Sequence, residues 1–192
     1  MSTHTLSALV ENKPGVLAHV AGLFSRRSFN ISSLAVGPTA DEAVSRMTIV
    51  VDGASTPVEQ VIRQLDKLVR VIKVVELADD AAVERELALI KLAADPPARA
   101  QILQIAEVFG ASVVDLAPES IVLEATGSAG KVEALLAVLA PYGIRELART
   151  GRVGLDRGPA SITDSTATDH EGPGVPGPRA AAAVGGALAH AS

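Results

Sequence analysis

The residues best suited to chemistry lie in the segment Glu11–Leu17, which reads ENKPGVL. Gly15 has no side chain, so the backbone there can approach a ligand closely. The free N–H groups at the start of a helix bind carboxylates, and the Asn12 side chain offers both a donor and an acceptor. Pro14 fixes the segment without adding a donor that needs a partner. These properties suit the backbone of a free amino acid, and they suit equally an ordinary turn that begins a helix.

Residues for catalysis or metal binding are sparse. The chain has no cysteine, which excludes thiolate nucleophiles, disulfides and thiolate zinc sites. Its histidines are scattered, at His4, His19, His170 and His190. Gly127–Lys131 resembles the end of a phosphate-binding loop, but Val132 stands where that motif needs Ser or Thr, so we interpret Ser128 as a helix cap. Glu84 and Glu86 are interpreted as surface residues. The sequence therefore predicts no catalytic residue, metal site or bound cofactor.

The composition argues against nucleic-acid and membrane functions. The net charge is −5 and aromatic residues make up 2%, whereas nucleic-acid binding needs a basic face and, for single strands, aromatic stacking platforms. No run of about 18 apolar residues could span a membrane, and the N-terminus lacks the pattern of a signal peptide. We therefore expect a cytoplasmic protein with no nucleic-acid or membrane partner, and the absence of cysteine fits that compartment.

Hydrophobic periodicity predicts the elements that hold the candidate loop. In the first strand Leu6, Ala8 and Val10 share one face, and the period then changes to that of a helix that begins at Val16. A second helix is predicted with Thr56 as its cap and Pro57 at its first position. The predicted order is strand, helix, strand, strand, helix, strand: His4–Val10, Val16–Arg27, Asn30–Val36, Ala43–Val51, a helix from Pro57, and Val69–Leu77.

The second half of the chain repeats this order after about 80 residues, which predicts two similar domains. In each, the helices would cover one face of a four-stranded antiparallel sheet, so that the fold class is α+β with two consecutive ferredoxin-like βαββαβ domains. The predicted elements of the second domain are strand Arg85–Ala93, a helix from Asp95, strands Ser112–Leu116 and Ser120–Thr126, a helix through Val132–Leu139, and strand Ile144–Thr150.

Changes in composition set the expected domain boundaries. We place the first domain at residues 1–78, a linker at 79–83 and the second domain at 84–157. Residues 158–192 are rich in Gly, Pro, Ala, Ser and Thr. Such a segment buries too little apolar surface to offset its ordering entropy, so we expect it to be disordered.

A family resemblance covers most of the chain. Residues 6–39, LSALVENKPGVLAHVAGLFSRRSFNISSLAVGPT, resemble the ACT domain of the acetolactate synthase small (regulatory) subunit. Further similar segments follow in the family's order, at SRMTIVV, QLDKLVRVIKVVEL, VERELALIKL and RTGRVGLDRG. A single ACT-like loop would be weak evidence, whereas this series spans residues 3–158 and is highly specific.

The resemblance implies a regulatory subunit in branched-chain amino acid biosynthesis, without catalysis of its own. It would activate a large catalytic subunit, which joins two pyruvates into 2-acetolactate with loss of CO2, and it would mediate feedback inhibition by valine or a related amino acid. The large subunit would carry thiamine diphosphate, Mg and FAD. In physical terms the effector must bind one state of the holoenzyme better than the other.

The resemblance also implies which residues bind the effector. In the family, ACT domains pair edge to edge as a homodimer and the amino acid lies between them. An edge strand that must be covered fits such pairing. The loop residues Asn12, Gly15, Val16 and Leu17 would contact the ligand's backbone groups, and Asn30 and Ile31 of the second chain would close the site. The second domain's loop, Ala94–Pro97, lacks the Asn-x-x-Gly arrangement, which makes a second such site doubtful.

Two alternatives remain for a fold of this kind. A free-standing ACT-domain amino-acid sensor would share the loop but act on another target. An acylphosphatase-like enzyme would need an arginine in the first loop to hold phosphate, and ENKPGVL has none. The length of the family match disfavours the sensor, and the missing arginine disfavours the enzyme.

Overall fold

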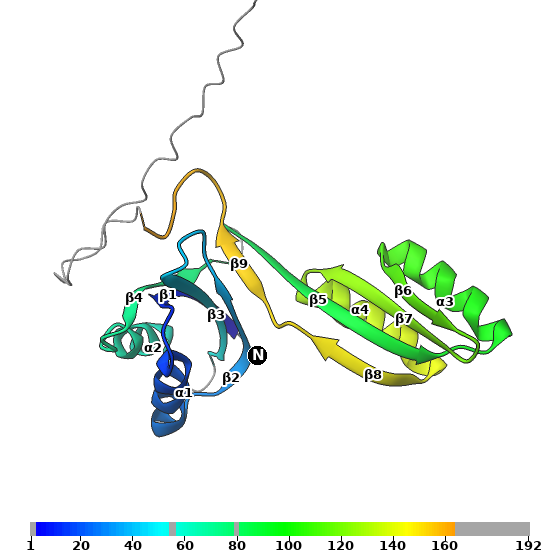
Figure 1. The fold of residues 1–192 in the computed structure, drawn as a ribbon, viewed down its shortest axis with the longest axis horizontal. Coiled ribbons are helices and arrows are strands. Elements are labelled where there is room, and N and C mark those ends of the chain that lie inside the picture. The colour runs from blue at the N-terminus through cyan, green and yellow to red at the C-terminus, as the bar shows by residue number, and fades with distance from the viewer. Residues whose placement is uncertain (1–2, 54–56, 79–80, 164–192) are drawn as a thin grey trace, which may run out of the picture.

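The candidate loop belongs to a four-stranded antiparallel sheet built by the first half of the chain. The computed structural model describes residues 3–53, 57–78 and 81–163. Helices α1 and α2 pack on one face of this sheet, whose strand order is β2-β3-β1-β4 (Figure 1). Its elements are β1 (Thr3–Glu11), α1 (Val16–Arg27), β2 (Ile31–Pro38), β3 (Val44–Asp52), α2 (Val58–Leu65) and β4 (Val71–Leu77).

Alternation of side chains along β1 builds the first core. Leu6, Ala8 and Val10 are buried together with Val20 and Phe24 of α1, which confirms the predicted face. The opposite face of β1 is buried as well, since Ser7 is 0% exposed and Leu9 5%. Both faces of β1 are therefore covered, and among the described residues helices cover only one of them.

The second half of the chain forms a second antiparallel sheet, in the order β6-β7-β5-β8 with β9 paired to β5 (Figure 1). Helices α3 and α4 bury its core face. The α+β class and the repeated βαββαβ order are thereby confirmed, with a fifth strand that the sequence did not predict. The elements are β5 (Ala82–Ala93), α3 (Pro96–Phe109), β6 (Ser112–Ala117), β7 (Ser120–Gly127), α4 (Ala129–Leu139), the 3₁₀ helix η1 (Ala140–Tyr142), β8 (Ile144–Arg149) and β9 (Val153–Asp156).

Strand β9 and the start of β5 form a short ribbon beside the first sheet. Ala82 pairs with Asp156, and Arg85 pairs with Val153. Gly154 packs so closely that a Cβ there would lie 2.7 Å from Cδ1 of Leu77 in β4. Figure 1 shows β9 running from the second sheet toward the first. The ribbon therefore ties the two sheets together on the face of the first sheet that carries no helix.

Arg46 marks the same helix-free face of the first sheet. Its guanidinium donates a 2.6 Å hydrogen bond to Oγ of Ser7. Burial lowers the pKa of Arg46, and the nearby charge of Asp156 in β9 partly opposes this effect. A partly buried arginine on a covered sheet face needs a hydrogen-bond acceptor, and here Ser7 supplies it while Asp156 adds a nearby negative charge.

Several predicted boundaries were wrong by one or two residues. Strand β4 begins at Val71, whereas Val69 is 98% exposed. Asn30 precedes β2, and Pro57 occupies the cap position of α2 instead of its first turn. The predicted cap Thr56 lies outside the described residues, and so do residues 164–192 of the segment 158–192 that the composition predicts to be disordered. In the described part of that segment Ile162 is 5% exposed. The domain boundaries stay a prediction. In the part of the chain that the structure describes, no helix is long and apolar enough to cross a membrane.

Candidate functional site

The loop between β1 and α1 is open at Gly15. This residue caps α1 with a φ of +85°, in the left-handed region that favours glycine. A Cβ added at Gly15 would have no atom within 4 Å. The glycine is therefore required by the backbone conformation, and the space above it is free for a ligand.

The start of α1 carries no counter-charge of its own. Among the described residues no side chain caps this helix, and its first turn holds no acidic residue. The N–H of His19 reaches the carbonyl of Gly15 at 3.0 Å, but the N–H of Val16 reaches only a distant carbonyl, that of Lys13 at 3.4 Å. The positive end of the helix dipole thus faces the open loop, which is the arrangement that attracts a carboxylate.

Asn12 is anchored to the turn between β2 and β3. Its Nδ2 donates to the carbonyl of Glu42 at 2.8 Å, and its backbone N–H donates to that of Ala43 at 2.7 Å. The sequence predicts that Asn12 offers a ligand both a donor and an acceptor. The bond to Glu42 uses one Nδ2 hydrogen and fixes the amide, and the carbonyl oxygen Oδ1, an acceptor, is the part of Asn12 that suits a ligand's ammonium group.

The other predicted site residues differ in exposure. Val16 is 3% exposed and packs in the first core, so only its backbone could contact a ligand. Leu17 is 46% exposed at the start of α1. Asn30 is exposed just before β2, and Ile31 is partly buried against the first core.

One chain does not bring the two predicted halves of the site together. Ile31 pairs with Val51, which pairs with His4 near the start of β1, whereas the loop follows Glu11 at the other end of β1. Seven residue steps separate His4 from Glu11, a span of about 23 Å in a strand. The loop and the start of β2 therefore lie at opposite ends of one sheet, and β2 is an edge strand of that sheet.

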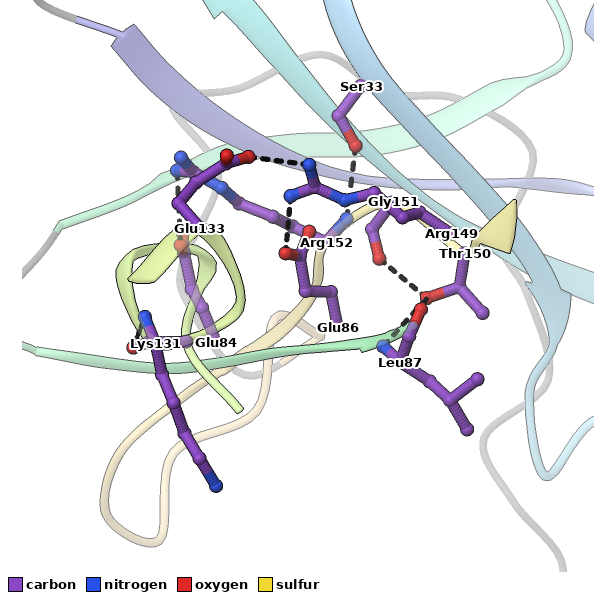
Figure 2. A network of polar contacts seen from close by, with 11 residues as sticks. Ser33, Glu84, Glu86, Leu87, Lys131, Glu133, Arg149, Thr150, Gly151 and Arg152 are labelled. Carbon is purple, nitrogen blue, oxygen red and sulfur yellow. Dashed lines mark hydrogen bonds and ion pairs between the residues drawn. The ribbon is translucent and has the colours of Figure 1, made fainter. Parts of the chain in front are cut away.

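A second polar cluster, centred on Arg149, was missed by the sequence analysis. Its guanidinium contacts Glu86 of β5 and Glu133 of α4, each at 2.5 Å (Figure 2). Burial lowers the pKa of Arg149, but hydrogen bonds and charges from Glu133 and Glu86 outweigh it and raise the pKa overall. Glu86 is 4% exposed, so its interpretation as a surface residue was wrong. The one sequence signal for this burial is that Glu84 and Glu86 lie two residues apart, and hence on one face, in a largely apolar strand.

A cavity of about 630 Å³ adjoins this cluster and is lined by residues of both halves of the chain, among them Ser33 of β2, Glu86 of β5, Gly130 of α4 and Arg152. The described residues hold no group of three or more His, Asp or Glu side chains placed to bind a metal ion. Arg149 and Arg152 are both ion-paired, the latter with Glu84 at 3.4 Å. The cluster is thus an internally paired contact between elements, which leaves the open loop at Gly15 as the stronger ligand candidate.

Comparison with protein families defines the class of the protein. Residues 6–73 match the AHAS small subunit-like ACT domain, and residues 85–158 match the family described as the small subunit of acetolactate synthase. The first sheet, with its glycine-capped α1, is therefore an ACT domain, followed by a second domain of similar order.

Individual relatives narrow this class to one family. A putative acetolactate synthase small subunit from Mycobacterium tuberculosis is 59% identical over 160 residues, which cover 83% of this chain and 95% of the relative. A probable acetolactate synthase small subunit from Archaeoglobus fulgidus is 53% identical over 81% of this chain and 97% of its own. The crystal structure of the Thermotoga maritima small subunit is 41% identical, with a TM-score of 0.77 over 83% of this chain and 100% of that one. The chain belongs to the acetolactate synthase small subunit family.

Proposed function

We propose that this chain is the regulatory subunit of an acetolactate synthase, with no catalysis of its own. It associates with a large catalytic subunit, raises its activity, and confers feedback inhibition by valine or a related branched-chain amino acid. The relatives' name of small subunit supports the existence of a larger partner, and their ACT domain supports a regulatory role. In this proposal thiamine diphosphate, Mg and FAD belong to that partner, where two pyruvates become 2-acetolactate and CO2.

The separation of the two half-sites is the observation that carries the effector proposal. The loop after Glu11 and the residues Asn30 and Ile31 lie at opposite ends of the sheet. If two copies pair antiparallel through the edge strand β2, the start of β2 in one copy lies at the end of the other copy's sheet that carries the loop after Glu11. A homodimer then completes two equivalent sites, as an isologous interface requires.

The loop geometry favours a free amino acid as the effector. Its carboxylate would accept hydrogen bonds at the start of α1 above Gly15, and its ammonium group would donate to Oδ1 of Asn12. Leu17, which is 46% exposed, would contact an apolar side chain such as that of valine. The carboxylate, the ammonium group and the apolar side chain of a branched amino acid would thus each contact a group of suitable chemistry.

Valine titration by calorimetry tests this proposal, with Gly15→Asp as the decisive variant. The new carboxylate would occupy the open space above Gly15 and repel that of the ligand, so we expect affinity to fall at least about 100-fold. Gly158→Asp is the matched control, since Gly158 also has a positive φ, +87°, and no atom within 4 Å of a Cβ. The control should bind valine as the wild type does.

Three results would count against the proposal. Undiminished valine binding by Gly15→Asp would mean that the site is elsewhere. A chain that stays monomeric in sedimentation with valine present would contradict the two-chain site. A chain that binds valine but neither co-purifies with nor activates a large subunit would instead be a free-standing amino-acid sensor.

A further inference from the structure

Strand β2 contains a bulge beside the proposed effector residue Ile31. Ile31 pairs with Val51 and Ser33 pairs with Val50, so that Ser32 is the extra residue. A bulge re-aims the side chains that follow it. Ile31 and Leu34 consequently both pack against the helix-covered core, while Ser33 faces the opposite side of the sheet.

The segment Arg149–Arg152, which runs from the last residue of β8 to the residue before β9, docks on this bulge. The N–H of Arg152 donates a 3.0 Å hydrogen bond to Oγ of Ser33. Gly151 has a φ of +78°, and a Cβ there would lie 2.5 Å from Oγ of Ser33 and 3.5 Å from the carbonyl oxygen of Leu34. Glycine is therefore needed at 151 for its conformation and for its close approach to β2.

The same segment is held firmly to the second sheet. Thr150 makes two hydrogen bonds with Leu87 of β5, each 3.1 Å long. The N–H of Thr150 donates to the carbonyl of Leu87, and the N–H of Leu87 donates to Oγ1 of Thr150. On either side of it, Arg149 pairs with Glu86 and Arg152 pairs with Glu84 (Figure 2). A displacement of residues 151 and 152 would thus be passed directly to β5.

Space for such a displacement exists next to the segment. The cavity of about 630 Å³ is bordered by Ser32 and Ser33 on the first sheet and by Thr150–Arg152. Movement into a cavity does not require a close-packed core to be rearranged, which is the costly part of most conformational changes. The bulge is therefore tied to the second sheet through Ser33 and borders space into which a displacement could occur.

We propose that Arg149–Arg152 act as a relay that couples effector binding at the start of β2 to the second domain, and hence to the catalytic partner. This inference rests on the proposed function and concerns the regulation of the same site. Valine bound against Asn30 and Ile31 would set the position of the bulge. Ser33 and Gly151 would transmit that position to β5 through Thr150. Ser33 and Gly151 are positioning residues, and they do not themselves touch the effector.

The test separates effector binding from inhibition. The full-length variants Ser33→Ala and Gly151→Ala are titrated with valine by calorimetry, and then reconstituted with the large subunit for inhibition assays. We expect the dissociation constant for valine to change by less than about twofold. The valine concentration for half-inhibition should rise about 5-fold for Ser33→Ala, which loses one hydrogen bond, and more than about 10-fold for Gly151→Ala.

Matched controls isolate the relay from general effects of added methyl groups. Gly37→Ala lies on the same strand, and Gly158→Ala shares the positive φ, yet a Cβ at either position meets no atom within 4 Å. Both should be inhibited as the wild type is. In the double variant Ser33→Ala/Gly151→Ala, the Oγ of Ser33 that would clash with the methyl group at position 151 is absent. The rise in the valine concentration for half-inhibition should therefore be smaller than the two single effects combined.

Each other outcome has a definite meaning. If the variants are inhibited like the wild type, the relay is wrong although the proposed function stands. If they lose valine binding in step with inhibition, the segment shapes the site and relays nothing, which also overturns the inference. If the wild type neither binds valine nor is inhibited by it, the proposed function itself fails.

Discussion

The two strand–helix loops of this protein occupy equivalent places in their domains and differ in how their helices begin. Helix α1 starts at Gly15 without a side-chain cap, whereas α3 starts at Asp95, whose carboxylate accepts a 2.9 Å hydrogen bond from the N–H of Ala98. The second loop is also filled by Arg99, which donates to the carbonyls of Ala94, Ala117 and Pro118. The start of α1 thus has no side-chain cap, whereas the start of α3 is satisfied by a carboxylate of the chain itself.

This difference indicates that a repeated fold need not carry a repeated site. A carboxylate of the chain itself stands at α3 where a ligand carboxylate would stand at α1. The terminus of α1 lacks the stabilisation of a side-chain cap, and at α3 that place is occupied by the Asp95 carboxylate. Substitutions in the two loops should therefore separate stability from binding.

The largest effect on stability is expected for Arg99→Ala. Its guanidinium bridges three carbonyls at 2.6–3.2 Å, and the carbonyl of Ala94, a residue that is 0% exposed, would lose this charged donor. We expect the free energy of unfolding to fall by about 2–3 kcal/mol, measured in urea. Valine affinity should stay unchanged, and a parallel loss of affinity would mean that the second loop contributes to the site.

Gly15→Ala should have an intermediate effect on stability. A methyl group there meets no atom within 4 Å, so the cost arises from the φ of +85° alone and should be about 1–2 kcal/mol. Gly37→Ala, with equal space and no positive φ, controls for the added methyl group. A cost near zero in thermal unfolding would show that Gly15 is not held in the left-handed conformation.

The smallest effect is expected for Asp95→Ala, which removes the cap of α3. Loss of one N-cap costs about 1 kcal/mol, and Ser128→Ala, which removes the 3.3 Å cap contact of α4, should cost a similar amount. Asp95→Ala should not gain a second valine site, because Arg99 still donates to the carbonyls of that loop. Appearance of a second site in calorimetry would mean that the cap alone excludes the ligand.

The fold could be predicted from the sequence because its signals are local. The alternation of Leu6, Ala8 and Val10 marked the core face of β1, and Ser128 was correctly assigned as the cap of α4. Strand β9 was missed because Val153–Asp156 has only four residues, includes Gly154, and pairs with residues some 70 positions earlier. No short-range periodicity encodes such a pairing.

The candidate site was only partly accessible to the same reasoning. The loop could be identified from Gly15 and Asn12, but the use of the Asn12 amide depends on Glu42, 30 residues away. The burial of Glu86 depends in the same way on Arg149, 63 residues away. Sequence patterns indicate which residues have suitable chemistry, whereas their partners become visible only in the folded chain. The assignment of effector residues stays a prediction.

Valine stoichiometry measures the contrast between the two loops most directly. Calorimetric titration of the full-length chain, with sedimentation of the same samples, gives the number of sites per chain and the oligomeric state together. We predict one valine per chain on a homodimer, with binding lost in Gly15→Asp and retained in Asp95→Ala. Two sites per chain, or binding that survives in Gly15→Asp, would contradict the account.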